Sequence, residues 1–266
     1  MNGYHIPVLL NEVLQALEVE PGEKYIDCTY GGGGHFRAIQ GAGGVVLGID
    51  QDPEAQAPVH GNFAHLKEIA LRAEFNQVAG ILFDLGVSSH QLETDYRGFS
   101  FRRGGLSKLD MRMNQTVGLT AADLINAGSE KELANLFFKY GEERESRKIA
   151  KAIVLNRPVQ TTDDLAKVIL RVSHRSSNDR THPATRVFQA LRIAVNDELA
   201  SLEEALPQAL ELLKPGGKLA VISFHSLEDR IVKNFMKKSL LIRPSLEEIN
   251  INPRARSGKL RVTKKI

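Results

Sequence analysis

Four short apolar runs constrain the fold of this 266-residue chain more than any other feature of its sequence. They span residues 25–29, 45–50, 80–84 and 218–223, and helical stretches separate them. Nearly continuous β-rich runs of this kind are typical of parallel strands that are covered by helices on both faces. We therefore predict an α/β fold with a doubly wound, Rossmann-like sheet.

The segment between the third and fourth runs has a different pattern. It contains no strand-like run from about residue 120 to residue 170, and its apolar residues recur at helical spacing. Three sequences resemble N-terminal capping boxes, in which a Ser or Thr precedes an acidic residue by three positions. They pair Thr120 with Asp123, Ser129 with Glu132, and Thr161 with Asp164. The sequence thus predicts a helical insertion over 104–180 that divides a sheet domain into 1–103 and 181–266.

The sequence also makes a prediction for the first helix and one for the stretch after the second strand. Leu10, Val13, Leu14 and Leu17 form one apolar helical face, and Pro7 suits the first turn of that helix. The stretch after Asp50 is short for a crossover between parallel strands, which normally needs at least about 10–12 residues. Either the crossover is abbreviated or residues are missing from it.

A glycine run follows the first predicted strand, at residues 31–34. Glycines let a ligand approach the backbone, and the N–H groups at the start of the next helix can bind it. Asp50 ends the second strand nineteen residues after Gly31, where a carboxylate can accept protons from ribose hydroxyls. This pattern is shared by sites for dinucleotides and for S-adenosylmethionine (SAM).

The details of the run favour SAM over NAD. The third glycine of the NAD fingerprint would fall at Phe36 or Arg37, so neither register completes it. Asp27 lies inside the first strand, where its carboxylate suits a cofactor with a sulfonium and an amino group. No phosphate-binding Walker sequence is present.

Polar residues also follow the third and fourth strands. Asp84 ends the third strand, with Ser88 and Gln91 soon after it, and should face the same crevice as Gly33 and Asp50. His225 follows the fourth strand, directly before a run in which Ser226 and Asp229 resemble a capping box. His60 and His65 lack metal-ligand spacing, so we expect no metal site.

Composition narrows the functional class. The formal net charge of +3 permits a nucleic-acid partner without requiring one. The single cysteine, Cys28, excludes an internal disulfide. No apolar run approaches the roughly 18 residues of a membrane span, and no signal-peptide pattern is present, so we expect a cytoplasmic protein that does not contact membranes.

Several sequence runs together resemble the RsmH (MraW) family of bacterial 16S rRNA cytosine-N4 methyltransferases. They cover nearly the whole chain in order, at residues 5–10, 84–89, 97–101, 109–113, 140–143, 182–186, 188–192, 223–233 and 252–257. The resemblance implies a class I SAM-dependent methyltransferase domain that is interrupted by a helical domain for substrate recognition. The segments 51–60 and 239–251 are shorter than in family members.

The resemblance also implies which residues bind the cofactor. Carried over by position, the SAM contacts are Gly33, Gly34, His35, Asp50, Phe63, Asp84 and Gln91. The substrate would be a cytosine in the decoding region of 16S rRNA, within the small ribosomal subunit. Asp84 is the first candidate to accept protons of the reacting amine, with Ser88 and His225 behind it. The sequence leaves open whether the protein forms a homodimer.

Basic residues provide candidate RNA contacts in two segments. One set is Arg97, Arg102, Arg103, Lys108 and Arg112, and the other is Arg254, Arg256, Lys259 and Arg261. Two other functions compete with methyl transfer: a non-catalytic RNA-binding or ribosome-assembly protein with a vestigial SAM pocket, and an NAD-dependent oxidoreductase. The oxidoreductase is disfavoured by the incomplete fingerprint.

Overall fold

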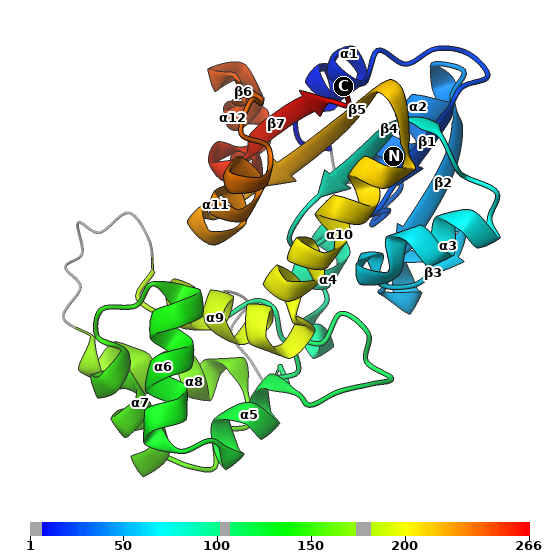
Figure 1. The fold of residues 1–266 in the computed structure, drawn as a ribbon. Coiled ribbons are helices and arrows are strands. Elements are labelled where there is room, and N and C mark those ends of the chain that lie inside the picture. Colours follow the sequence, from blue (N-terminus) through cyan, green and yellow to red (C-terminus); the bar gives the residue numbers. More distant parts are fainter. Residues whose placement is uncertain (1–6, 102–106, 174–181) are drawn as a thin grey trace. The chain divides into compact units, whose positions relative to one another are not determined.

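The computed structural model describes residues 7–101, 107–173 and 182–266, and the chain divides into two compact units. The sheet unit combines Met1–Ser88 with Leu199–Ile266, and the helical unit is Ser89–Glu198. Figure 1 shows one unit built around a sheet and the other built from helices. The helical unit extends beyond 104–180 on both sides, and the predicted boundaries near 103 and 180 fall outside the described residues.

In the described part of the chain, seven strands form one sheet in the order β3-β2-β1-β4-β5-β7-β6. The strands are β1 (Lys24–Asp27), β2 (Val45–Asp50), β3 (Val59–His60), β4 (Val78–Asp84), β5 (Leu213–Ser223), β6 (Leu240–Ile242) and β7 (Lys259–Lys264). Strands β1 to β5 pair in parallel, whereas β7 is antiparallel to both β5 and β6. The four predicted strands are therefore confirmed.

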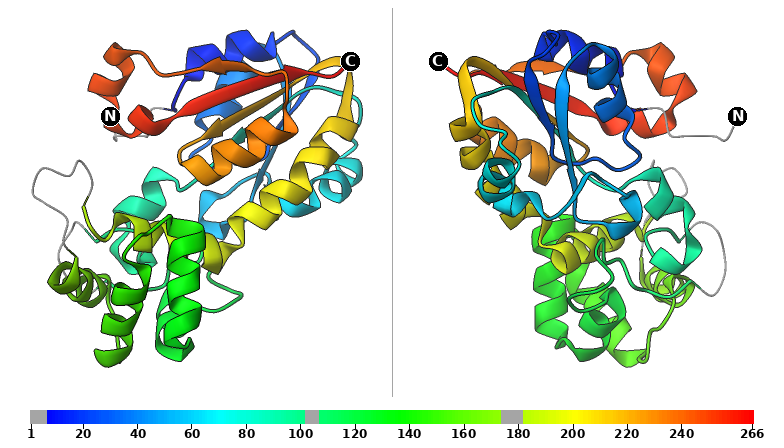
Figure 2. Two further views of the ribbon diagram at one scale, coloured as in Figure 1. Left: turned by 60° about the vertical axis from the view of Figure 1, so that its left-hand side comes forward. Right: turned by 90° about the vertical axis from the view of Figure 1, so that its right-hand side faces the viewer.

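Helices cover both faces of this sheet (Figures 1 and 2). Ile26, Ile81 and Val221 belong to a core cluster shared with one group of helices: α3 (Leu66–Arg72), α10 (Glu198–Leu212) and α11 (Ser226–Phe235). Tyr25 and Leu82 belong to the cluster shared with the other group: α1 (Leu10–Leu17) and α2 (Gly34–Gly41). Since neighbouring residues of one strand enter opposite clusters, the strands are buried on both sides, as their apolar runs predicted.

The crossover after β2 is abbreviated. Only residues 51–58 separate β2 from β3, and they contain the short 3-10 turn η1 (Pro53–Ala55) in place of a helix. The two-residue strand β3 still pairs in parallel with β2, with Ile49 opposite Val59 and Asp50 opposite His60. The 3-10 turn η2 (Phe63–His65) and α3 then lead to β4.

The N-terminal helix begins later than predicted. Helix α1 starts at Leu10, and Leu9 before it has a left-handed backbone with φ of 56°. Pro7 therefore lies outside the helix rather than in its first turn. Toward the C-terminus of the chain, α12 (Leu246–Ile251) and η4 (Pro253–Ser257) precede β7.

The helical unit confirms the three predicted capping boxes. Its elements are α4 (Ser89–Glu93), η3 (Asp95–Arg97), α5 (Ala121–Ala127), α6 (Glu130–Gly141), α7 (Ser146–Leu155), α8 (Thr162–Val172) and α9 (Thr185–Asn196). Thr120, Ser129 and Thr161 cap α5, α6 and α8, each with the expected acidic partner. Helix α6 packs against α7 and α9, and α7 packs against α8. Among the described residues, no helix combines the length and apolar character needed to cross a membrane.

Candidate active site

The carboxylates predicted at the strand ends lie at one edge of the sheet. Asp50, at the end of β2, accepts hydrogen bonds from the backbone N–H groups of Gly31 (2.7 Å) and Asp52 (2.8 Å). These bonds hold the glycine run against the end of the neighbouring strand. Each carboxylate oxygen has a second lone pair, so Asp50 retains the capacity to accept protons from a ligand.

Asp84 lies at the same edge, where both its backbone and its side chain contact neighbouring residues. Its backbone N–H donates to Thr29 Oγ1 (2.6 Å), and its Oδ2 lies 3.4 Å from His35 Nε2. The histidine is 5% exposed. Within the described residues, both ring nitrogens of His35 and Asp84 Oδ1 are buried without an aligned hydrogen-bond partner. Buried polar atoms of this kind indicate a place for a ligand, because they are costly to leave unsatisfied.

The electrostatics of this edge favour a cation. Burial raises the pKa of Asp27 to about 6, an effect that His35 opposes and that Asp84 and Asp50 reinforce. Burial also raises the pKa of Asp50. Burial acts to lower the pKa of His35, but the neighbouring carboxylate of Asp84 outweighs it and raises that pKa. A positively charged group would relieve the repulsion among these three carboxylates.

Asp27→Asn is expected to stabilise the ligand-free protein at neutral pH. Because the pKa of Asp27 is higher in the folded state (about 6) than the ordinary value of an aspartate (3.8), the protein loses stability as pH rises through this range. The substitution removes that loss, which is about 3 kcal/mol at pH 7.5 and about half of that at pH 5. Urea unfolding of both proteins at the two pH values measures the difference.

Asp123→Asn is the matched control. This carboxylate has a pKa that is lowered by its hydrogen bonds to the side chain and backbone of Thr120, so its charge stabilises the folded state. Its removal should therefore destabilise the protein at neutral pH and have little effect well below the pKa. If Asp27→Asn destabilises the protein at pH 7.5 as Asp123→Asn does, then burial of the charged Asp27 carboxylate does not cost the folded state stability, and the prediction is wrong.

The glycine run divides into two parts. Gly33 has a φ of 72°, donates its N–H to the Tyr30 carbonyl, and has no room for a Cβ beside the Tyr30 ring at 2.8 Å. A Cβ on Gly34 would overlap the ring of Pro7. A Cβ on Gly32, by contrast, would meet nothing within 4 Å. The chain's own packing therefore requires Gly33 and Gly34, and the open space lies beside Gly32.

The remaining predicted site residues lie in several places. Ser88 borders the glycine run, since its Cβ lies 3.8 Å from where a Gly31 Cβ would be. Phe63 lies in η2 and packs edge-to-face against Phe83, with ring centroids 5.5 Å apart. Gln91 is buried in α4 of the helical unit, whereas the others belong to the sheet unit.

His225 is the N-cap of helix α11, and the predicted capping box there is wrong by one residue. The ring Nδ1 of His225 accepts from the Glu228 N–H (3.3 Å), and Glu228 Oε2 accepts from the N–H groups of His225 (3.2 Å) and Phe224 (2.7 Å). The box is thus His225 with Glu228, in place of Ser226 with Asp229. His225 therefore orders the loop that follows β5.

Ser223 is a site candidate that sequence reasoning missed. It is the last residue of β5, 1% exposed, and its hydroxyl has no partner within the described residues. The preceding residue, Ile222, pairs with Asp84, so Ser223 lies at the same edge of the sheet. Its position at the end of a buried strand was the available signal.

Burial excludes one of the predicted RNA contacts, and ion pairs engage three others. Arg97 is fully buried and donates to the carbonyls of Met113 (2.8 Å) and Arg112 (3.2 Å), so it cannot contact RNA. Arg112 forms a two-pronged pair with Asp110, at 2.8 and 2.9 Å. Arg102 and Arg103 lie outside the described residues. Lys259 and Arg261 both pair with Asp229.

Comparison with known proteins shows the family of this chain. The model of the MraW methylase family matches residues 2–241. The ribosomal RNA small subunit methyltransferase H of Nostoc sp. is 49% identical, over 98% of this chain and 92% of its own length. The protein of the same name from Thermomicrobium roseum is 46% identical, over 98% of this chain and 94% of its own. That alignment is 308 positions long, more than the 266 residues here, so the relative contains residues without a counterpart. The Rossmann-like fold of class I SAM-dependent methyltransferases is confirmed, and the chain belongs to the MraW methylase family.

Proposed function

We propose that this protein transfers a methyl group from SAM to the exocyclic N4 amine of a cytosine in 16S rRNA. The observation that carries the proposal is the buried pair of Asp84 and His35, whose unsatisfied atoms lie at a carboxylate-rich sheet edge. The names of the relatives support small-subunit rRNA as the substrate. Ribosomal RNA as substrate also favours a cytoplasmic location and contact with the small subunit.

The residues present fit SAM. Asp27, Asp50 and Asp84 provide negative charge for a cofactor that carries a sulfonium and an ammonium group. Asp50 would hold the ribose hydroxyls, Phe63 would pack on the adenine, and the backbone at Gly33 to His35 would receive the methionine moiety. The N–H groups in the first turn of α2 have no partner within the helix and attract a carboxylate. When bound, SAM supplies an electrophilic methyl group on its sulfur.

Asp84 would prepare the amine for attack. The lone pair of a cytosine N4 is conjugated with the ring, so the nitrogen is a poor nucleophile until acceptors hold its protons. The unsatisfied Asp84 Oδ1 is such an acceptor, and Ser88 and Ser223 are further candidates. His225 does not fit this role, because its Nδ1 accepts from the Glu228 N–H and its Nε2 lies 3.0 Å from Glu228 Oε1. Positioning and preorganised charge then contribute most of the acceleration. The target base has to leave its stack to reach this edge.

The helical unit is the proposed substrate-recognition domain. Exposed cations line one side of α7, where Arg147 and Lys151 recur one turn apart after Arg144. Within the described residues these three form no ion pair. Contacts of this kind with RNA depend on phosphate charge and shape rather than on sequence.

Incubation with radiolabelled SAM tests the function. We expect label to enter 16S rRNA in small ribosomal subunits or as naked RNA, and mass analysis of the digested nucleosides to identify N4-methylcytidine. Both substrates should be offered side by side, because they expose the target base to different degrees.

Three outcomes would contradict the proposal in whole or in part. Calorimetric binding of NADH without binding of SAM would favour an oxidoreductase. Binding of SAM and RNA with no label in any cytosine would favour a non-catalytic assembly protein. Label in a different base would retain methyl transfer and reject the cytosine assignment.

A further inference from the structure

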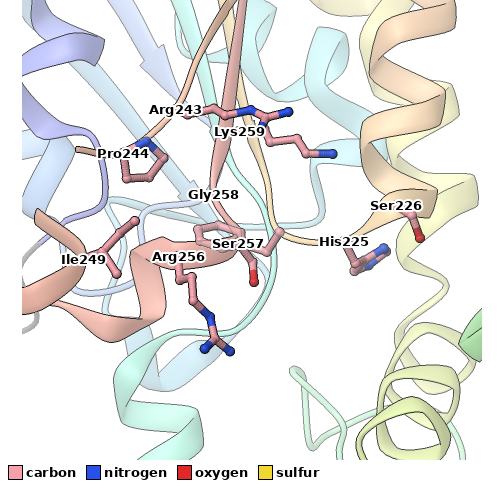
Figure 3. A pocket seen from close by; sticks show the side chains of 10 residues that line it. His225, Ser226, Arg243, Pro244, Ile249, Arg256, Ser257, Gly258 and Lys259 are labelled. Atoms are coloured by element: carbon pink, nitrogen blue, oxygen red, sulfur yellow. The ribbon is translucent and has the colours of Figure 1, made fainter. Parts of the chain in front are cut away.

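A cavity of about 420 Å³ opens on the sheet unit beside the end of β5. Three segments line it: the start of α11, the stretch before and within α12, and the junction of η4 with β7. Figure 3 shows that its polar side chains come from His225, Ser226, Arg243, Arg256, Ser257 and Lys259. No acidic residue is among the described residues that line it, so the lining is suited to an anion.

Two of the three cations in this lining are available to a ligand. Arg243 and Arg256 are exposed, and neither forms an ion pair or a side-chain hydrogen bond with another described residue. Lys259 is engaged by Asp229 at 2.7 Å, but Asp229 also receives Arg261 at 2.8 Å. One carboxylate is thus shared between two cations, and a net positive charge remains there.

The carboxylate of Asp229 stays ionised and paired with Lys259 and Arg261, which leaves Arg243 and Arg256 as the unpaired cations among the described residues of the cavity. Partial burial acts to raise its pKa, but the hydrogen bonds from Arg261 and Lys259 outweigh burial and hold that pKa below its usual range. Glu228, the other acid at the start of α11, is buried and accepts from the backbone of Phe224 and His225. Both acids near the cavity are therefore occupied by the protein itself.

The directions of the cations distinguish a strand from a single ion. In Figure 3 the side chains of Arg243 and Lys259 extend toward the same side, while that of Arg256 extends in another direction. Diverging guanidinium groups suit two successive phosphates better than one phosphate held between them. Arginine also matches phosphate geometry with paired N–H donors. The volume is in the range that admits a nucleotide-sized ligand.

We propose that this cavity binds the phosphodiester backbone of a single RNA strand, with Arg243 and Arg256 contacting different phosphates. The proposal rests on the proposed function, because the strand is the one that carries the target base. Ser257 provides a hydroxyl donor to the same backbone. Since these contacts read phosphates, they contribute affinity and position without contributing sequence preference.

The test compares two double variants in binding to a labelled single-stranded RNA of about 12 nucleotides, without SAM. R243A/R256A removes the two free cations of the cavity. K237A/K238A removes two exposed cations that follow the other end of α11. For each protein, the dissociation constant is measured over a series of KCl concentrations, and circular dichroism verifies folding.

We expect R243A/R256A to weaken binding at least about tenfold near 0.1 M KCl and to reduce the salt slope by about 1.4, which is two single-strand phosphate contacts. K237A/K238A should remain near wild type in both quantities. An equal loss in both variants, or an unchanged salt slope in R243A/R256A, would overturn the proposal.

A competition experiment separates a strand from a free ion. At constant ionic strength, inorganic phosphate should displace the RNA only weakly, because it offers one of the two phosphates. Full displacement by inorganic phosphate at concentrations near those of the RNA would show a free-phosphate site and overturn the proposal. The binding readout needs no methyl transfer, so failure of the catalytic function and failure of this site are distinguishable.

Discussion

Asp84→Asn is expected to slow methyl transfer by about 100- to 1,000-fold at saturating SAM. The asparagine keeps the shape of the side chain and one acceptor oxygen, but it loses the charge that holds the protons of the amine. It also removes the carboxylate that lies 3.4 Å from His35 Nε2. Single-turnover rates on small ribosomal subunits, with both cofactor and enzyme in excess over RNA, measure the chemical step apart from product release.

Two further measurements make this result specific. Because Asp84 raises the pKa of His35, that pKa should fall in the variant, and NMR titration of the histidine can follow it. Ser88→Ala should reduce the rate much less, since a hydroxyl contributes no charge. A rate within about threefold of wild type in Asp84→Asn, together with a shifted His35 pKa, would show that the amine is oriented by another group.

Gly98→Ala is expected to destabilise the helical unit by at least about 3 kcal/mol. Gly98 has a φ of 74°, and a Cβ there would overlap the Lys108 carbonyl and lie 2.7 Å from the Asp110 nitrogen. Both obstacles are backbone atoms, so no side chain can move aside. Hydrogen exchange across Ser89–Glu198, read by mass spectrometry, should show faster exchange in this unit.

Gly118→Ala isolates the contribution of the backbone conformation alone. Gly118 has nearly the same φ, 78°, but a Cβ there would meet nothing within 4 Å. The left-handed conformation should cost about 1 kcal/mol, so Gly118→Ala should be the milder of the two variants. Equal effects at both positions would mean that the backbone near Lys108 yields to the added methyl group.

Local rules made the sheet and the helix starts predictable. The four strands were recognisable because residues buried on both faces must be apolar throughout, and Thr120, Ser129 and Thr161 followed the preferred chemistry of N-caps. The start of α11 escaped the same rule. Histidine is not among the preferred N-cap residues, so the pattern favoured Ser226 over His225.

Burial and pairing between distant segments were not readable from the sequence. Arg97 lies in a basic segment, as an RNA contact would, yet its guanidinium donates to the backbone carbonyls of Arg112 and Met113. Backbone acceptors of this kind have no sequence signature. The pairing of Lys259 and Arg261 with Asp229 likewise depends on how β7 lies against α11. The clustering of Asp50 and Asp84 was predictable because parallel strands place their carboxyl ends at the same edge of the sheet.

The interruption of the sheet unit by the helical unit has a consequence for synthesis of the chain. Strand β4 is central in the sheet, but its neighbour β5 leaves the ribosome only after the whole helical unit. Until then β4 presents an unpaired apolar edge, which other chains can pair with. Nascent chains that have emerged only as far as α9 should therefore be the ones most in need of chaperones.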